Sequence, residues 1–149
     1  MNKNIATCTD FLTALQTHNA YLAPAASQQE IILANTTLQQ MRAAILPGFL
    51  IELYAQCGGI IMDSGYIFGP HPIHRGIKYP VPNIQTINSE LSAITQLRGK
   101  TIFGRNDLFW LGFDSFGTCY MLNNMNTSVM RKYDNPWAGM YDCLMAGKF

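Results

Sequence analysis

Two histidines on one loop are the first residues whose types and spacing could do chemistry, in this case as metal ligands. His71 and His74 are separated by two residues in a proline-rich stretch, so they lack the geometry of two ligands on one helix face. A third ligand would have to come from Asp63 or Cys57. Because two ligands alone make a weak site, we interpret the stretch as a surface loop and predict no metal and no cofactor.

Thiol chemistry is the second possibility, because Cys57 stands before a pair of glycines. We expect Cys57 at the C-terminal end of a helix, where the helix dipole disfavours a thiolate. It is therefore predicted to be a small packed side chain. Cys8, Cys119 and Cys143 stand far from it and form no Cys-x-x-Cys pair, so we expect reduced, mostly buried thiols.

Phosphate binding is suggested by Gly99-Lys100-Thr101, which resembles the end of a P-loop. That motif needs a glycine where Ile94 stands and a helix after the threonine, whereas a strand is expected here. A small basic cluster also precedes an aromatic run, as in surfaces that bind nucleic acid, but Asp107 interrupts it. We predict neither a nucleotide nor a nucleic-acid partner. The cluster and the run are Arg98, Lys100, Arg105, Phe109, Trp110 and Phe113.

Paired carboxylates for hydrolysis are equally scarce. The glutamates are Glu30, Glu52 and Glu90, and Glu30 is expected to cap a helix. Asp114 stands in a predicted hairpin, where an aspartate with a following Gly117 has an ordinary turn role. We therefore predict no catalytic residue and no enzymatic activity.

The chain has little charge. Its 149 residues suit a single domain, 1–149, and only 13% of them are charged, about half the usual quarter. The formal net charge of +1 gives no long-range field to attract nucleic acid or an anionic membrane. We expect recognition through shape, aromatic side chains and amide hydrogen bonds. With no apolar stretch typical of a signal peptide or a membrane span, a cytoplasmic location without membrane contact is predicted.

The elements that would position these residues begin with helices. A first helix is expected from Thr9, which would cap it, and Ser27-Gln28-Gln29-Glu30 reads as a capping box before a second helix. Pro47 is expected to open a third helix that ends at Gly58-Gly59. Apolar residues spaced by three or four predict a fourth helix from Ile84 to Ile94.

Strands follow the helices. A short strand is expected at 65–68, and four more at 101–105, 108–113, 118–122 and 128–133, joined by hairpin turns. A short helix from about Trp137 to Met145 closes the chain. Helices followed by a meander predict an α+β fold, with N-terminal helices packed on a mainly antiparallel sheet.

Several of these segments, in this order, resemble the signature of the SUKH superfamily, which includes the Smi/Knr cell-wall regulators and many bacterial immunity proteins. The arrangement is most similar to the YrhA-like branch and covers about Ser27 to Leu144. Cys57 stands where the family pattern often has asparagine. The segments that carry the resemblance are Leu46-Pro47, Phe49 to Tyr54, Cys57-Gly58-Gly59, the helix from Pro82 to Leu91, Ile102 to Asp107, Gly112 to Gly117 with Tyr120, and Val129 to Asp134.

The resemblance implies a non-enzymatic α+β domain that acts by protein–protein contact. Bacterial members are typically immunity proteins that neutralise a toxin, so we expect a toxin domain encoded nearby as the partner. A regulatory or adaptor module without a toxin partner is the alternative, and the oligomeric state stays open. For the contact surface we predict the long loop, whose arginine and tyrosine are typical interface anchors. The predicted contact residues are His71, His74, Arg75, Lys78 and Tyr79.

Overall fold

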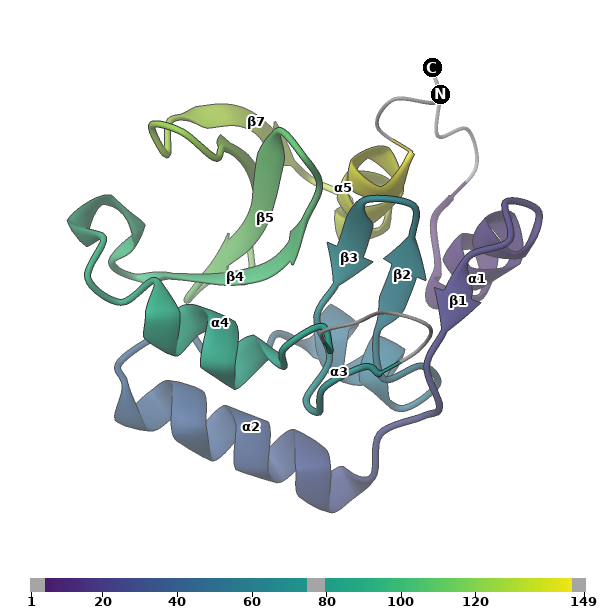
Figure 1. Cartoon of the computed structure of the whole chain (residues 1–149), viewed down its shortest axis with the longest axis horizontal. Helices are drawn as coiled ribbons and strands as arrows, with labels where there is room; N and C mark the ends of the chain where they lie inside the picture. The colour runs from purple at the N-terminus through teal and green to yellow at the C-terminus, as the bar shows by residue number, and fades with distance from the viewer. Residues whose placement is uncertain (1–4, 75–79, 146–149) are drawn as a thin grey trace.

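The computed structural model describes residues 5–74 and 80–145 and has an α+β fold (Figure 1). Within these two ranges, five helices and one short 3-10 helix accompany a seven-stranded antiparallel sheet whose strands are ordered as they occur in the chain. The predicted meander is therefore confirmed, and it extends further toward the N-terminus than expected. The elements are α1 (Cys8–Gln16), β1 (Tyr21–Leu22), α2 (Gln28–Gln40), α3 (Gly48–Tyr54), β2 (Ile60–Met62), β3 (Gly65–Ile67), α4 (Ile84–Glu90), η1 (Thr95–Leu97), β4 (Lys100–Arg105), β5 (Phe109–Asp114), β6 (Cys119–Asn123), β7 (Val129–Tyr133) and α5 (Pro136–Leu144).

The N-terminal caps of α1 and α2 follow from local sequence. The capping box of α2 is confirmed, because the Glu30 amide donates to Ser27 Oγ at 3.1 Å and the Ser27 amide donates to Glu30 Oε1 at 2.8 Å. The predicted cap of α1 was wrong by two residues. Thr7, in an extended conformation, accepts from the Asp10 amide at 3.1 Å, whereas Thr9 lies inside the helix.

Helix α3 begins and ends differently from the prediction. Pro47 is extended and forms the N-cap, so the helix starts at Gly48 and ends at Tyr54, before the glycine pair. The glycines serve close packing instead of capping. A Cβ at Gly58 would lie 2.5 Å from the Pro24 carbonyl oxygen, and Gly59 has a φ of +142°.

The fourth predicted helix is also shorter than expected. Helix α4 ends at Glu90, and the chain then tightens into the turns that lead to η1. Asn88 of α4 is buried beside β4. It lies next to Ile102, a part of β4 that β3 does not pair with. Its Nδ2 donates to the carbonyl oxygen of Ile102 and its Oδ1 accepts from the Ile102 amide, both at 2.8 Å. The Asn88 side chain thus bonds the amide and the carbonyl of Ile102, which would otherwise be buried at the edge of β4 without hydrogen-bond partners.

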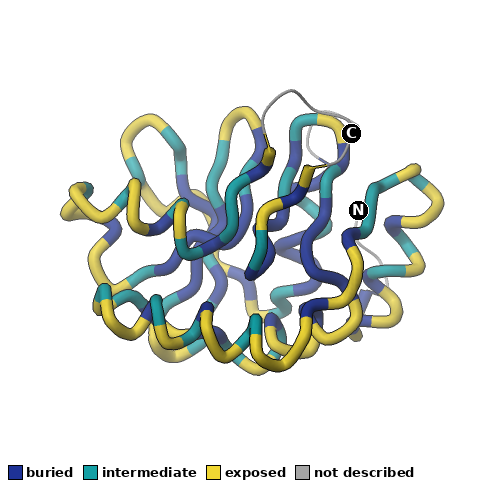
Figure 2. The backbone as a smooth tube through the Cα atoms, turned by 60° about the horizontal axis from the view of Figure 1, so that its bottom comes forward, coloured by how far each residue is buried: buried dark blue, intermediate teal, exposed yellow. Residues whose placement is uncertain are grey.

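The core lies between the sheet and three helices. Helix α5 packs across strands β3 to β7, and α1 and α3 pack beside it on the same side. Aromatic contacts join these layers, with ring centroids 5.8 Å apart for Phe49 and Phe103, 6.0 Å for Phe49 and Trp137, and 5.7 Å for Phe11 and Trp137. Figure 2 shows that the strand interiors are buried while the outer turns of the helices are exposed.

Helices α2 and α4 run side by side below the sheet in Figure 1 and contact each other. Their neighbouring ends, together with η1 and the start of β4, form the region described in the next subsection. Within the described ranges, no helix is long and apolar enough to cross a membrane.

Candidate functional site at the end of the sheet

The loop predicted to contact a partner is only partly described. Arg75, Lys78 and Tyr79 lie outside the described residues. His74 is exposed, whereas His71 packs against the body of the protein, where a Cβ at Gly58 would lie 2.8 Å from its Nε2. The Nε2 atom of His71 also lies 4.0 Å from a Glu30 carboxylate oxygen. Of the predicted contact residues, the structure therefore describes only His71 and His74, and their contact with a partner stays a prediction.

Metal and thiol chemistry have no candidate site within residues 5–74 and 80–145. No group of three or more His, Cys, Asp or Glu side chains in these ranges could hold a metal ion. All four cysteines are free and buried. Burial raises the pKa of Cys57, and it raises the pKa of Cys8 to about 11 and of Cys119 to about 12, so these thiols stay protonated at neutral pH. The packing role predicted for Cys57 fits this environment, and its Sγ donates to the Gly59 carbonyl oxygen at 3.1 Å.

Asp114 has the turn role that the sequence predicts. Its Oδ1 accepts from the amides of Phe116 at 2.9 Å and Thr118 at 3.0 Å, and its Oδ2 accepts from the Tyr120 hydroxyl at 2.9 Å. Partial burial alone would raise the pKa of Asp114, but these hydrogen bonds and the nearby Lys100 ammonium lower it overall. The β5–β6 turn is therefore held in one conformation by a charged acceptor, with Gly117 supplying a φ of +79°.

Phe116, at the tip of this turn, is 91% exposed. Large aromatic side chains are enriched among the residues that anchor protein–protein contacts, so an exposed aromatic on a rigid turn is a candidate binding anchor. The turn lies beside the N-cap of α3, because a Cβ at Gly117 would lie 3.5 Å from Cβ of Pro47. Ile45, two residues before Pro47, is 52% exposed. We call Ile45, Lys100 and Phe116 the sheet-end surface.

Strand pairing places Lys100 on this surface. It pairs with Asp114 across β4 and β5, and its Nζ lies 5.5 Å from the centre of the Tyr120 ring. The next residue, Thr101, is fully buried and its hydroxyl donates to the Ala44 carbonyl oxygen at 2.6 Å, which ties β4 to the segment after α2. Thr101 therefore cannot serve a phosphate as a P-loop threonine would.

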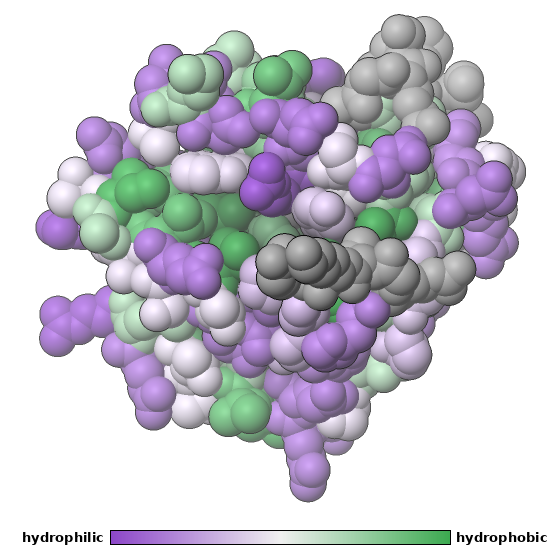
Figure 3. Space-filling model, viewed as in Figure 1, coloured by the Kyte–Doolittle hydropathy of each residue, from purple (hydrophilic) through white to green (hydrophobic). Residues whose placement is uncertain are grey.

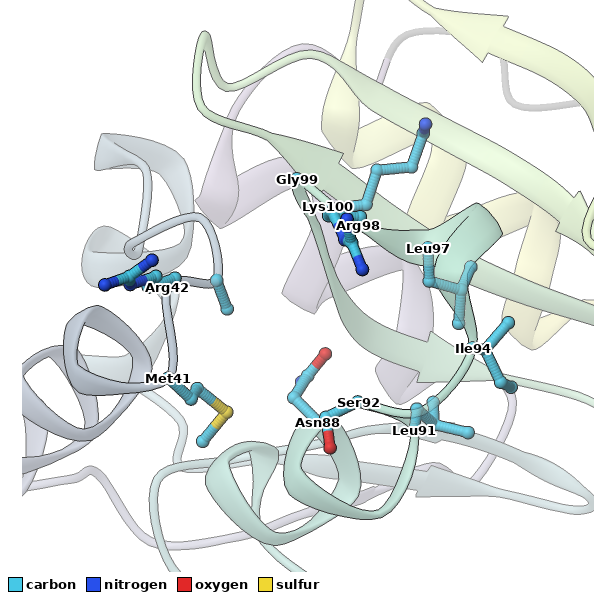
Figure 4. A pocket seen from close by; sticks show the side chains of 11 residues that line it. Met41, Arg42, Asn88, Leu91, Ser92, Ile94, Leu97, Arg98, Gly99 and Lys100 are labelled. Carbon is cyan, nitrogen blue, oxygen red and sulfur yellow. The ribbon is translucent and has the colours of Figure 1, made fainter.

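A pocket of about 460 Å³ opens next to the sheet-end surface, where the ends of α2 and α4 meet η1 and β4. In Figure 4 the Arg98 guanidinium points toward the interior of the pocket from one side, and Arg42 lies on the opposite side with its guanidinium directed away from the pocket. The Lys100 ammonium extends away along the sheet, so only the lower part of that side chain lines the pocket. The lining residues are Met41, Arg42, Ala43, Asn88, Leu91, Ser92, Ile94, Leu97, Arg98, Gly99 and Lys100.

The pocket is next to a hollow in the sheet. Figure 3 shows hydrophobic atoms at the floor of a hollow over strands β4 and β5. The register of β4 and β5 places Ile102 opposite Gly112. Both lie on the face of the sheet that is opposite to Phe113 and α5. A Cβ at Gly112 would lie 3.2 Å from Cδ1 of Ile102 and 3.7 Å from Cδ1 of Leu122, so these two buried side chains fill the space over this glycine.

Sequence reasoning identified the turn of Phe116 but not the exposure of its ring. It also assigned Arg98 and Lys100 to a basic cluster without Arg42, which lies far away in sequence and lines the same pocket only in the folded chain. An aromatic residue at a central position of a predicted turn is the signal that would have pointed to Phe116. The chain's sequence matches no protein-family model and no curated protein.

Proposed function

We propose that the protein is an immunity-type protein that binds a bacterial toxin domain through its sheet-end surface and neutralises it without catalysis. The observation that carries the proposal is Phe116, 91% exposed on a turn fixed by the Asp114 carboxylate. A rigid aromatic anchor loses little conformational freedom on binding, so most of its buried apolar area contributes to affinity. The ordered resemblance to the SUKH superfamily supports the toxin as the class of partner.

The sheet-end surface also fits a chain with little charge. Phe116 and Ile45 provide apolar contact area, and Lys100 provides a cation that the Asp114 carboxylate partly balances. Such a surface recognises a partner mainly through shape and apolar burial, so its affinity should depend weakly on salt. The long loop with His74 is a second contact region, because His74 is exposed and its neighbour Ile73 is fixed by a bridge to Val81.

The test is co-expression with toxin domains encoded beside the gene, scored by growth rescue and by recovery of a complex. Phe116→Ala should weaken binding by about tenfold or more, as expected for a hot-spot aromatic. Met125→Ala is the matched control, because Met125 is 92% exposed on the β6–β7 turn at the other end of β6. Equal binding by both variants would refute the assignment of this surface. Failure to rescue growth or form a complex with any adjacent toxin would refute the immunity function and favour the adaptor alternative.

A further inference from the structure

Helices α2 and α3 enclose a groove of about 440 Å³, which we call the α2–α3 groove. One wall is a single face of α2, made by four residues at helical spacing, and the other wall is Ile51 of α3 with Ala55 at its C-cap. Ile32 is 56% exposed and Ile51 is 37% exposed, so the groove is open to solvent. The α2 wall consists of Gln28, Ile31, Ile32 and Asn35, and Ala26 lies beside it.

Hydrogen bonds at both ends fix the walls of the α2–α3 groove. At one end the Ala26 amide donates to the Tyr54 carbonyl oxygen at 2.9 Å, which ties the segment before α2 to the end of α3. At the other end the Leu46 amide donates to Asn35 Oδ1 at 2.7 Å, which ties the segment before α3 to the middle of α2. The groove is therefore formed in the free protein, and a ligand would not have to order its walls.

The apolar residues of this groove are not all needed for the core. The fully buried residues of α2 are Ala34 and Leu38, and α2 also packs against α4. Ile32 and Ile51 instead expose large apolar side chains on two neighbouring helices. Contiguous apolar surface of this kind marks an interaction site.

The shape and chemistry of the groove favour a helix as its occupant. Among its described lining residues only Gln28 and Asn35 have polar side chains, and Asn35 Oδ1 is already bonded to Leu46. An extended segment would bury backbone amides and carbonyls there without partners, at a cost of about 1–3 kcal/mol for each group. A helix satisfies these groups internally. From Gln28 to Asn35 the wall extends about 10 Å, which suits roughly two helical turns.

The charge of the surrounding helices indicates what the polar face of the occupant should carry. Helices α1, α2 and α3 contain the acidic residues Asp10, Glu30 and Glu52 and no lysine or arginine. The hydrogen bond from the Ser27 amide lowers the pKa of Glu30, so this carboxylate is ionised at neutral pH. A helix with a basic polar face would be attracted to this side of the molecule, and one with an acidic face would be repelled.

We infer that the α2–α3 groove binds an amphipathic helix of a protein partner. The apolar face of that helix contacts Ile32 and Ile51, and its lysines or arginines lie near the acidic residues of α1 to α3. The groove shares no residue with the sheet-end surface, and the inference does not depend on the toxin proposed above.

Fluorescence anisotropy on the full chain tests the inference with three labelled peptides of about 14 residues, or roughly four helical turns. The first peptide has leucines on one helical face and lysines on the other. The second replaces every lysine with glutamate, and the third keeps the leucines but replaces two central lysines with proline, which breaks the helix. The lysine peptide should bind at least about tenfold more tightly than either of the others.

Two variants, checked for folding by thermal unfolding, locate the binding site. Ile32→Asn removes part of the apolar wall, and Ala55→Met fills the groove with a larger apolar side chain. Each should weaken binding of the lysine peptide by about tenfold. Leu33→Asn is the matched control, because Leu33 is the next residue of α2 and is 62% exposed but does not line the groove. Its affinity should equal that of the wild type.

Several results would overturn the inference. An equal loss of affinity in Leu33→Asn and Ile32→Asn, or tighter binding by Ala55→Met, would show that the peptide responds to apolar surface in general. Equally tight binding of the glutamate or the proline peptide would remove the role of charge or of helical structure. A wild-type dimer that Ile32→Asn converts into a monomer would assign the groove to a second copy of the chain. The inference would also fail if the lysine peptide did not bind the folded wild type.

Discussion

Arg42 allows a stability prediction that separates backbone strain from side-chain contacts. A left-handed conformation costs an L-residue about 1–2 kcal/mol, and glycine avoids this cost. Glycine also gains freedom in the unfolded chain, which offsets roughly 0.5–1 kcal/mol of the benefit. Because the Arg42 side chain is exposed and forms no salt bridge within residues 5–74 and 80–145, little else is lost. Arg42→Gly is therefore expected to stabilise the fold by about 1 kcal/mol.

The expected shift is measurable in a chain of 149 residues. An unfolding entropy of about 2.1 cal/mol/K per residue makes 1 kcal/mol equivalent to roughly 3 °C in Tm. Urea unfolding and thermal unfolding should agree on the gain. Arg42→Ala is the informative comparison, since it removes the guanidinium but keeps the left-handed backbone of a residue with a Cβ. We expect Arg42→Ala to change stability by less than about 0.5 kcal/mol.

A clear loss of stability in Arg42→Gly would refute this reasoning. If Arg42→Ala were equally destabilised, the guanidinium would have to stabilise the native state directly.

Two further predictions concern the framework of the same region. Asn88→Ala should destabilise the fold by about 3 kcal/mol in urea unfolding, because it leaves the buried amide and carbonyl groups of Ile102 without partners; a loss below about 1 kcal/mol would contradict the role given to Asn88. The pKa of Asp114 is lowered in the folded state, so its contribution to stability is present above the unfolded pKa of about 3.9 and is lost as the pH falls through the folded pKa. Asp114→Asn should therefore lose less stability than the wild type on acidification from about pH 6 to pH 3, and an identical loss in both proteins would refute this assignment.

The sequence predicted those parts of the fold that depend on local chemistry. The capping box at Ser27 and Glu30 and the turn at Asp114 are short-range hydrogen-bonding patterns, and both are confirmed. Strands β4 to β7 were predicted within one residue of their observed bounds, because alternation and turn residues are local signals. Strands β1 and β2 were missed because two or three residues are too few to show alternation, and only pairing with distant residues defines them.

The candidate sites were less predictable because they are assembled from distant segments. The pocket combines the end of α2 with α4, η1 and the start of β4, which only the tertiary fold brings together. Arg42 gave no signal, because the left-handed position after a helix is recognised in a sequence by glycine or asparagine. The exposure of Phe116 depends on which way its turn faces, and hydrophobic character alone favours the core.

The two hydrogen bonds of Asn88 to Ile102 also determine where the chain can vary in length. Because a side chain satisfies this part of the β4 edge, the segment after β3 does not have to continue as a strand. Ile73 and Val81 bond to each other through both amides, at 2.9 and 2.8 Å, and close the segment between them at its base. Insertions there would leave the sheet intact and cost only loop-closure entropy, about 0.6 kcal/mol for each doubling of length. Related chains could therefore diversify this loop while keeping one scaffold.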